Sequence, residues 1–321
     1  MNLTDKSVLV TGGAGFIGSH FVDRLIREEP SRVTVVDNFF LGSMRNLQDA
    51  LEVRPDIEVI RLDAADLAAM QDVVTTHDVE VVFDFAVVPL PTSLDYPSWT
   101  VTTNVGIVTT FCEIARREMI ERLVHISSSE AYGSARYSPM DEDHPHDAIT
   151  PYAASKSAGD HIIHSYVETF GIDATVLRPF NNVGPRQNLG SYAGIIPIVV
   201  RKVLSGEPIE IYGDGEQTRD IIFAPHTADA VVKVYDEPRA HRQVLNLASG
   251  VETSMNDLVR RLLLLLDAPD HPIVHTDPRP GDVRRHIADP RKLQDLVGIT
   301  IEPVSDQSLK ETVEYYRALL S

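Results

Sequence analysis

Over its first 180 residues the chain alternates short apolar runs with longer stretches of helical period. Six runs rich in Val, Ile and Leu predict strands at 7–12, 32–37, 57–62, 79–85, 122–128 and 173–180. Between them, apolar residues recur at three- and four-residue spacings, which predicts helices at 18–29, 66–76, 102–118 and 152–170. Parallel strands joined by crossover helices carry helices on both faces of the sheet. The predicted fold class is therefore α/β, a doubly wound parallel sheet.

The remainder of the chain is less regular. From about residue 181, Pro and Gly become denser and the elements shorter, which predicts a smaller C-terminal α/β lobe. We predict that residues 1–180, with 221–247 returning to them, form a nucleotide-binding domain, and that 181–220 and 248–321 form the substrate-binding lobe. The leucine run at 262–266 is far shorter than the ~20 residues of a membrane span, so it predicts a buried helix.

Composition narrows the classes of partner. A formal net charge of −18 opposes binding to nucleic acid, and no cluster of Lys and Arg offers a basic stripe. Cys112 is the single cysteine, and the N-terminal residues lack a signal-peptide pattern, so we expect a reducing, cytoplasmic setting with no membrane partner. His144 and His146 are separated by a proline and lack a third spaced ligand, so no metal site is predicted.

A glycine-rich turn follows the first predicted strand. Gly12, Gly15 and Gly18 lie three residues apart where a helix begins, so the backbone can approach a pyrophosphate at the helix N-terminus. A merely tight turn is the alternative. Asp37 ends the second predicted strand, where a carboxylate accepts from a ribose hydroxyl and repels a 2′-phosphate, which favours NAD over NADP in a Rossmann-type site. Asp63 either reaches the adenine or caps the next helix.

Tyr152 and Lys156 lie four residues apart at the start of a predicted helix, so their side chains share one face. The pKa of a free tyrosine is about 10, and a neighbouring ammonium favours the phenolate. An exposed tyrosine and a solvated lysine are the alternative. Because serines 127–129 end a strand upstream, we expect one of them to align a substrate hydroxyl while Tyr152 takes its proton and NAD takes hydride.

Five segments together resemble the extended short-chain dehydrogenase/reductases that modify nucleotide sugars: TGGAGFIGSH, VVDN, SSSEAYG, PYAASK and GDGEQTRDII. The resemblance covers essentially the whole chain. It implies catalysis by Ser128, Tyr152 and Lys156, and a homodimer that pairs the helices at 102–118 and 151–170. It places a UDP-sugar against Ser128, Asn181, Arg219 and Arg279, although surface charge is the alternative for the arginines. Further NAD contacts are implied for Phe16, Ile17, Asn38, Ala64, Phe85, Ala86 and Asn104.

The family divides at ISSSEAYG, residues 126–133. Its 4-epimerases usually place small, non-acidic residues after the catalytic Ser or Thr, its 4,6-dehydratases place Asp-Glu, and its uronate decarboxylases Ser-Glu. This chain has Ser129 and Glu130. Oxidation at sugar C4 acidifies the C5 hydrogen, so a carboxylate at C5 permits elimination of the C6 hydroxyl.

The chain most resembles the NAD-dependent UDP-N-acetylglucosamine 5,6-dehydratases of tunicamycin biosynthesis, which make an exo-glycal. A UDP-hexose 4-epimerase is the main alternative, followed by a decarboxylase and a non-catalytic NAD-binding sensor. Two positions depart from the family. Asp84 stands where histidine is common, which we interpret as a changed packing contact, and FAPHTADA at 223–230 changes the segment after Arg219.

Overall fold

The computed structural model describes residues 2–189, 194–277 and 283–320. Its main sheet has seven parallel strands in the order β10-β6-β5-β4-β1-β2-β3. These are β1 (Ser7–Thr11), β2 (Arg32–Asp37), β3 (Glu58–Arg61), β4 (Val81–Asp84), β5 (Arg122–Ile126), β6 (Ala174–Pro179) and β10 (Val244–Leu247). All six predicted strands are present, and the doubly wound fold class is confirmed.

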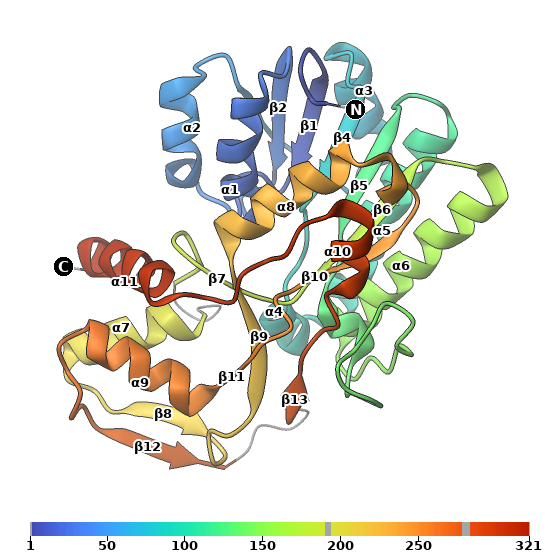
Figure 1. Cartoon of the computed structure of the whole chain (residues 1–321). Coiled ribbons are helices and arrows are strands. Elements are labelled where there is room, and N and C mark those ends of the chain that lie inside the picture. Colours follow the sequence, from blue (N-terminus) through green and yellow to red (C-terminus); the bar gives the residue numbers. More distant parts are fainter. Residues whose placement is uncertain (1, 190–193, 278–282, 321) are drawn as a thin grey trace.

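Helices cover both faces of this sheet because alternate strand residues point to opposite sides. Val8 and Val10 face one core with α1 (Phe16–Leu25), α2 (Gln48–Val53) and α8 (Ala224–Asp236). Leu9 faces the other core, which includes residues of α3 (Leu67–Thr76), α5 (Pro97–Arg116) and α6 (Pro151–Phe170). A short helix, α4 (Leu90–Asp95), precedes α5. Figure 1 shows α1 and α8 on one side of the sheet and α5 and α6 on the other.

A second set of elements lies below the main sheet in Figure 1. Its core combines α7 (Ile195–Ser205), β8 (Ile209–Tyr212), α9 (Met255–Leu265) and α11 (Asp306–Leu320), and β12 (Ile273–Thr276) pairs with β8. Four strands form the connecting sheet: β7 (Asn181–Val183), β9 (Thr218–Phe223), β11 (Glu252–Ser254) and β13 (Arg285–His286).

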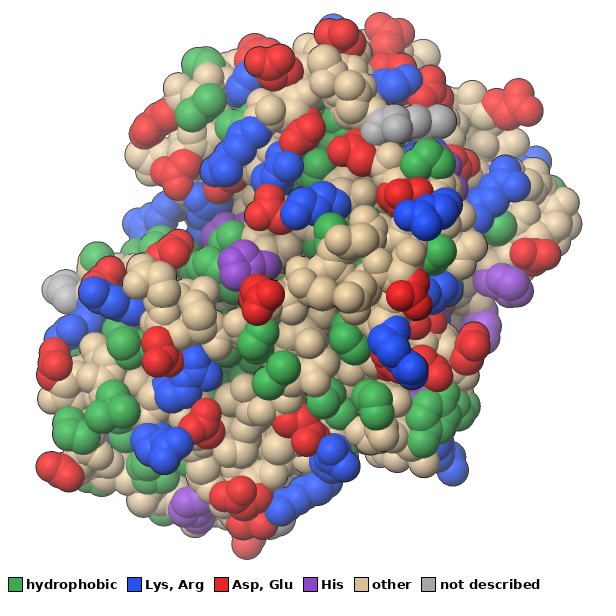
Figure 2. All heavy atoms as spheres, viewed as in Figure 1, with side chains coloured by type: hydrophobic (Ala, Val, Ile, Leu, Met, Phe, Trp, Pro, Cys, Tyr) green, Lys and Arg blue, Asp and Glu red, His purple; other side chains and the backbone are tan. Residues whose placement is uncertain are grey.

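The leucine run that predicted a buried helix ends α9 and is amphipathic. Leu262 and Leu263 are buried, whereas Leu264 is 60% exposed, so the helix buries one face only. In the described part of the chain, no helix is both long and apolar enough to cross a membrane. Acidic and basic side chains are interspersed over the face in Figure 2.

The chain passes between the two sets of elements several times. After β9 it returns through α8 to β10, which joins the main sheet beside β6. Near the C-terminus, α10 (Arg291–Val297) also packs on this first core, through Leu293, and Ile301 follows it there. The predicted division into two domains stays a prediction, and these two residues lie in the core of the first domain although the prediction assigns them to the second.

Candidate active site

A pocket of about 370 Å³ opens at the carboxyl ends of the main strands. This is where ligands bind in doubly wound sheets, beside the point at which the strand order reverses. Here β1 lies between β2 and β4, so that point is at the glycine-rich turn after β1. The pocket wall includes these predicted residues: Gly12, Gly15, Phe16, Ile17, Gly18, Asp37, Asn38, Asp63, Ala64, Phe85, Ala86, Ser128, Tyr152 and Lys156.

The turn after β1 admits only glycine at its tightest point. Gly12 has φ +63°, and a Cβ there would lie 2.7 Å from the backbone nitrogen of Ala86 in the turn after β4. A Cβ on Gly18 would overlap the carbonyl oxygen of Gly12. The side-chain-free turn therefore brings the N-terminus of α1 close to the pocket, where its free amides attract a phosphate group.

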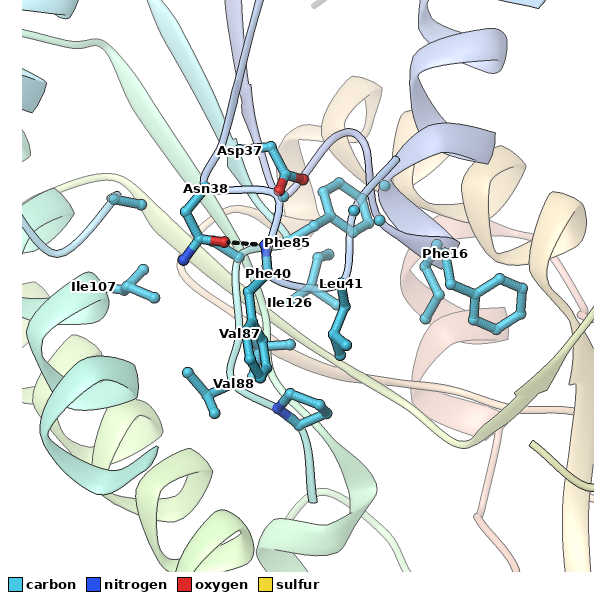
Figure 3. Close-up of a pocket in the computed structure, with 18 of the residues that line it drawn as sticks. Phe16, Asp37, Asn38, Phe40, Leu41, Phe85, Val87, Val88, Ile107 and Ile126 are labelled. Atoms are coloured by element: carbon cyan, nitrogen blue, oxygen red, sulfur yellow. Dashed lines mark hydrogen bonds between the residues drawn. The ribbon is translucent and has the colours of Figure 1, made fainter. Parts of the chain in front are cut away.

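Asp37 ends β2 at the rim of the pocket. Its Oδ2 accepts from the Ala14 amide at 3.1 Å and its Oδ1 from the Phe39 amide at 2.8 Å. Burial raises the pKa of the carboxyl, and these two hydrogen bonds oppose the shift. Each oxygen keeps a lone pair for a ribose hydroxyl. Figure 3 shows Asp37 beside Asn38, whose side-chain oxygen accepts from the Phe40 amide at 2.9 Å.

Two further predicted cofactor residues occupy different positions. Asp63 lines the pocket and accepts from the Ala65 amide at 3.0 Å, whereas the cap of α3 is Asp66. The alternative that Asp63 caps this helix was therefore wrong. Asn104 does not line the pocket. Its side chain accepts from the Val88 amide at 2.7 Å and donates to the Val88 carbonyl at 3.0 Å and to the Ser155 hydroxyl. Asn104 therefore holds the pocket residue Val88 in position without lining the pocket itself.

Tyr152 and Lys156 enter the pocket from the first turns of α6, whose N-cap is Thr150. The Lys156 ammonium is buried and donates to the Ile126 carbonyl at 2.7 Å. Burial lowers the pKa of Lys156, and the charges of Asp84 and Asp160 oppose that change. Burial, with smaller contributions from Glu130 and Asp160, raises the pKa of Tyr152 to about 12, and a hydrogen bond with Ser128 opposes the shift.

The serines and the glutamate after β5 form a short 3-10 helix, η3 (Ser129–Tyr132). Ser128 caps it, accepting from the Glu130 amide at 3.2 Å, and lines the pocket. Ser129 is buried and does not line the pocket. Glu130 lies outside the pocket wall but is close enough to Tyr152 to change its pKa. Ser128 is therefore hydrogen-bonded both to the predicted base and to the backbone amide of Glu130.

The predicted substrate contacts come from the connecting sheet. Asn181 on β7 pairs with Ile221 on β9, two residues after Arg219, and neither Asn181 nor Arg219 lines the pocket. Arg219 donates to the carbonyls of Thr218 and Val283 at 2.8 and 2.7 Å. Arg279 lies outside the described residues. The altered segment after Arg219 begins α8, where Phe223 packs edge-on against His226.

Several pocket residues escaped the sequence prediction. The loop after β4 supplies an apolar part of the wall, and the end of β6 with the segment after it supplies two apolar and three polar residues, because both reach the carboxyl edge of the sheet. These residues are Val87, Val88, Pro89, Pro179, Phe180, Asn182, Gln187 and Asn188. Figure 3 shows Val87, Val88 and Leu41 among the apolar side chains of the wall. The only available signal was the strand end at RPFNN.

The histidines of the loop before α6 have protein partners. His144 accepts from the Arg136 amide at 2.9 Å, and His146 bonds the Ser157 hydroxyl at 2.7 Å. Both rings pack edge-on against Tyr132. Within the described ranges, no group of three His, Cys, Asp or Glu side chains could hold a metal ion.

The chain is similar to known proteins over nearly its whole length. A model of the NAD dependent epimerase/dehydratase family matches residues 8–248. The chain belongs to this family. It is 34% identical over 311 residues to a UDP-glucose 4-epimerase of Mycolicibacterium smegmatis, covering 96% of this chain and 98% of that one. It is 33% identical over 316 residues to a dTDP-glucose 4,6-dehydratase of Streptomyces niveus, with 97% and 92% covered.

Solved structures agree. A UDP-N-acetylglucosamine 4-epimerase from Methanobrevibacter ruminantium, in complex with UDP-N-acetylmuramic acid, is 32% identical with a TM-score of 0.90, and the alignment covers 98% of this chain and 99% of that one. The chain is therefore an NAD-dependent member of an epimerase/dehydratase family that acts on nucleotide sugars. Two features of the pocket fit NAD: the turn at Gly12, where a Cβ would clash with the Ala86 backbone, and the buried carboxylate of Asp37.

Proposed function

We propose that the protein is a nucleotide-sugar dehydratase that removes the C5 proton and eliminates the C6 hydroxyl, with UDP-N-acetylglucosamine as substrate and a 5,6-unsaturated sugar as product. Such an exo-glycal is a precursor for antibiotic biosynthesis. Bound NAD would take hydride from C4 and, after the elimination, return it there, so that the product regains its C4 hydroxyl and the net change is the loss of one water. Ser128 aligns the C4 hydroxyl, Tyr152 accepts its proton, and Lys156 provides positive charge beside the phenol. Because burial raises the pKa of Tyr152 to about 12, that positive charge is required for the phenolate to form near neutral pH.

The chemistry after C4 oxidation falls to Glu130. Its carboxylate takes the C5 proton, and the electron pair of the broken C–H bond forms the 5,6 double bond as the C6–O bond breaks. The hydroxyl leaves as water after Glu130 returns the proton. Ser129 is buried, so it does not replace the aspartate that dehydratases carry there. A single carboxylate that acts first as base and then as acid requires no second acidic residue.

One observation carries this proposal. Glu130 lies in the short helix that Ser128 caps, and it acts electrostatically on Tyr152. A carboxylate beside the base opposes phenolate formation, because two negative charges then lie close together. An enzyme that only inverts C4 gains nothing from that penalty, whereas an enzyme that breaks the C5–H bond requires a base at this position.

A UDP-hexose or UDP-hexosamine 4-epimerase is the second candidate. It is favoured by the names of similar proteins, a UDP-glucose 4-epimerase and a UDP-N-acetylglucosamine 4-epimerase. In that reaction Glu130 would only hydrogen-bond the substrate or the backbone. Mass separates the two, since elimination loses water and epimerisation conserves mass.

The test uses the NAD-loaded protein with UDP-N-acetylglucosamine and UDP-glucose in deuterated water. The wild type should yield a product lighter by one water, with an alkene visible by NMR. Glu130→Gln should still reduce NAD but should place no deuterium at C5 of the recovered substrate, whereas Tyr152→Phe should lose both activities. Continued deuterium entry at C5 of the substrate recovered from the Gln variant would remove Glu130 as the base, and a product of unchanged mass would favour the epimerase.

A homodimer through α5 and α6 is also part of the proposal. It rests on the resemblance alone. Light scattering during gel filtration should give twice the mass of one 321-residue chain, and a monomeric mass would contradict it.

A further inference from the structure

A row of polar side chains crosses the main sheet beneath α6. Thr11, Asp84 and His125 occupy one register row on β1, β4 and β5, and all three are buried. The Thr11 hydroxyl donates to Asp84 Oδ1 at 2.6 Å, and His125 Nδ1 lies 2.7 Å from Asp84 Oδ2. The interpretation of Asp84 as a changed packing contact was therefore too weak, because the carboxylate is the centre of a hydrogen-bond network.

The geometry fixes the hydrogen bonds within this row. His125 Nε2 is buried and has no hydrogen-bond partner among the described residues. Nδ1 is therefore the ring nitrogen that bonds Asp84. Asp84 also accepts from the Ala86 amide at 3.3 Å, so its two oxygens share three hydrogen bonds.

Helix α6 brings Lys156 onto this row. The ammonium donates to the carbonyl of Ile126, the residue after His125. One turn later, a Cβ on Gly159 would lie 3.9 Å from His125 Nε2, so the helix passes directly over the imidazole. Burial lowers the pKa of Lys156, and the charge of Asp84 opposes this shift more strongly than the charge of Asp160 does.

The other groups that face Lys156 and Asp84 are already compensated or neutral. On α6, Asp160 also acts on Lys156, but Arg178 donates to it at 2.7 Å. Tyr152 is a neutral phenol below its raised pKa of about 12. From α5, Cys112 faces Asp84, and burial raises the pKa of its thiol to about 12, so it stays uncharged. Of the two carboxylates that act on Lys156, Asp160 is thus paired with Arg178, whereas Asp84 has Lys156 as its nearby cation.

We propose that Asp84, held by His125 and Thr11, is a positioning residue that serves as the buried counter-charge of Lys156 and keeps this lysine cationic beside Tyr152. The proposal rests on the roles proposed above for Tyr152 and Lys156. Asp84 does not line the pocket and acts only through the lysine. Removing the Asp84 carboxylate should change the pH at which Lys156 releases its proton. Removing a residue with a purely structural role would leave that pH unchanged.

The first test reads the lysine directly in the NAD-loaded protein. The sequence has six lysines, so NMR of isotope-labelled lysine side chains gives few signals, and Lys156→Met identifies the one of interest. Asp84→Asn should lower the titration midpoint of Lys156 by about one pH unit or more. A midpoint equal to that of the wild type would overturn the proposal.

Matched variants separate charge from packing. Thr11→Val removes a hydrogen bond to the same carboxylate without removing its charge, so the Lys156 midpoint should stay unchanged. His125→Asn places an amide donor near the Nδ1 position and also leaves the charge of Asp84 in place, so it should keep the wild-type midpoint as well. If Asp84→Asn does not fold, Asp84→Ser removes the same charge with a smaller polar side chain, and a wild-type midpoint in that variant would contradict the proposal.

Kinetics provide the second readout. For NAD reduction by UDP-N-acetylglucosamine, Asp84→Asn should shift the basic limb of the pH–rate profile downward with the lysine midpoint, lowering kcat at that pH while KM changes little. Normal sugar oxidation with an unshifted Lys156 would overturn this proposal and leave the proposed function intact. A shifted Lys156 in a protein that oxidises no sugar would overturn only the proposed function.

Discussion

At the scale of single residues, the site combines groups whose ordinary charge states conflict with their surroundings. Burial lowers the pKa of Lys156 and raises the pKa of Tyr152 to about 12. In the proposed mechanism, positive charge on Lys156 makes a base of the tyrosine. The rate of C4 oxidation should therefore rise with pH as the phenolate becomes populated, until Lys156 loses its proton.

Removing the phenol should abolish that dependence. Tyr152→Phe should lower the rate of NAD reduction by a factor of about 10² to 10⁴, the usual contribution of a general base, with NAD still bound. The control is Tyr132→Phe, which removes another buried hydroxyl, one that donates to Asn246 at 2.7 Å outside the pocket wall. It should change stability and leave the rate nearly intact. Stopped-flow absorbance of NADH measures both, and an unimpaired Tyr152→Phe enzyme would contradict the mechanism.

At the scale of elements, the sequence predicted the features that lie within one segment and missed those that form when distant segments pair. Six strands and four helices followed from apolar period, and Gly12, Asp37, Tyr152 and Lys156 from spacing within one strand–helix unit. The seventh strand was missed as a strand, although 221–247 was expected to return to this domain. β10 has only four residues and little period of its own, and it is fixed by pairing with β6.

The site shows the same limit. Val88 enters the pocket from the loop after β4 and Asn182 enters it from β7, which is distant in sequence, and the Asp84–His125 pair forms only when β4 and β5 align. A pairing across strands leaves no periodic signal in either segment, so a single sequence shows two polar residues in apolar runs and not their contact.

The glycine turn gives a prediction at this scale, because it joins the β1 and β4 turns. Gly12→Ala should lower NAD affinity at least tenfold, since the new Cβ would push the Ala86 backbone away from the pocket. Gly171→Ala is a matched control: its φ of +70° imposes similar strain, but no atom lies within 4 Å of its Cβ position. Each substitution should destabilise the fold by about 1 kcal/mol or more through strain. Titration calorimetry with NAD should therefore separate them, and equal affinities would argue against the tight turn as a cofactor contact.

At the scale of the whole molecule, two buried histidines make the stability of the fold depend on pH. His20 on α1 bonds the Pro185 carbonyl at 3.0 Å, and His286 on β13 packs against Phe180, so both rings lie where the main sheet meets the connecting sheet. Burial lowers the pKa of each from 6.5 to about 4. Both rings are therefore neutral in the folded protein at pH values where the unfolded chain is protonated.

The sign of the resulting pH dependence follows from proton counts. Between pH 6.5 and 4 the unfolded chain binds one more proton at each ring, so folding stability is complete above pH 6.5 and is lost as pH falls toward 4. Each histidine should contribute a slope of about 1.4 kcal/mol per pH unit there. Urea unfolding at several pH values measures the slope. The double variant His20→Asn with His286→Asn should remove the contributions of both histidines from it. If the double variant keeps the wild-type slope, other groups cause the acid lability and these two rings are not neutral anchors between the sheets.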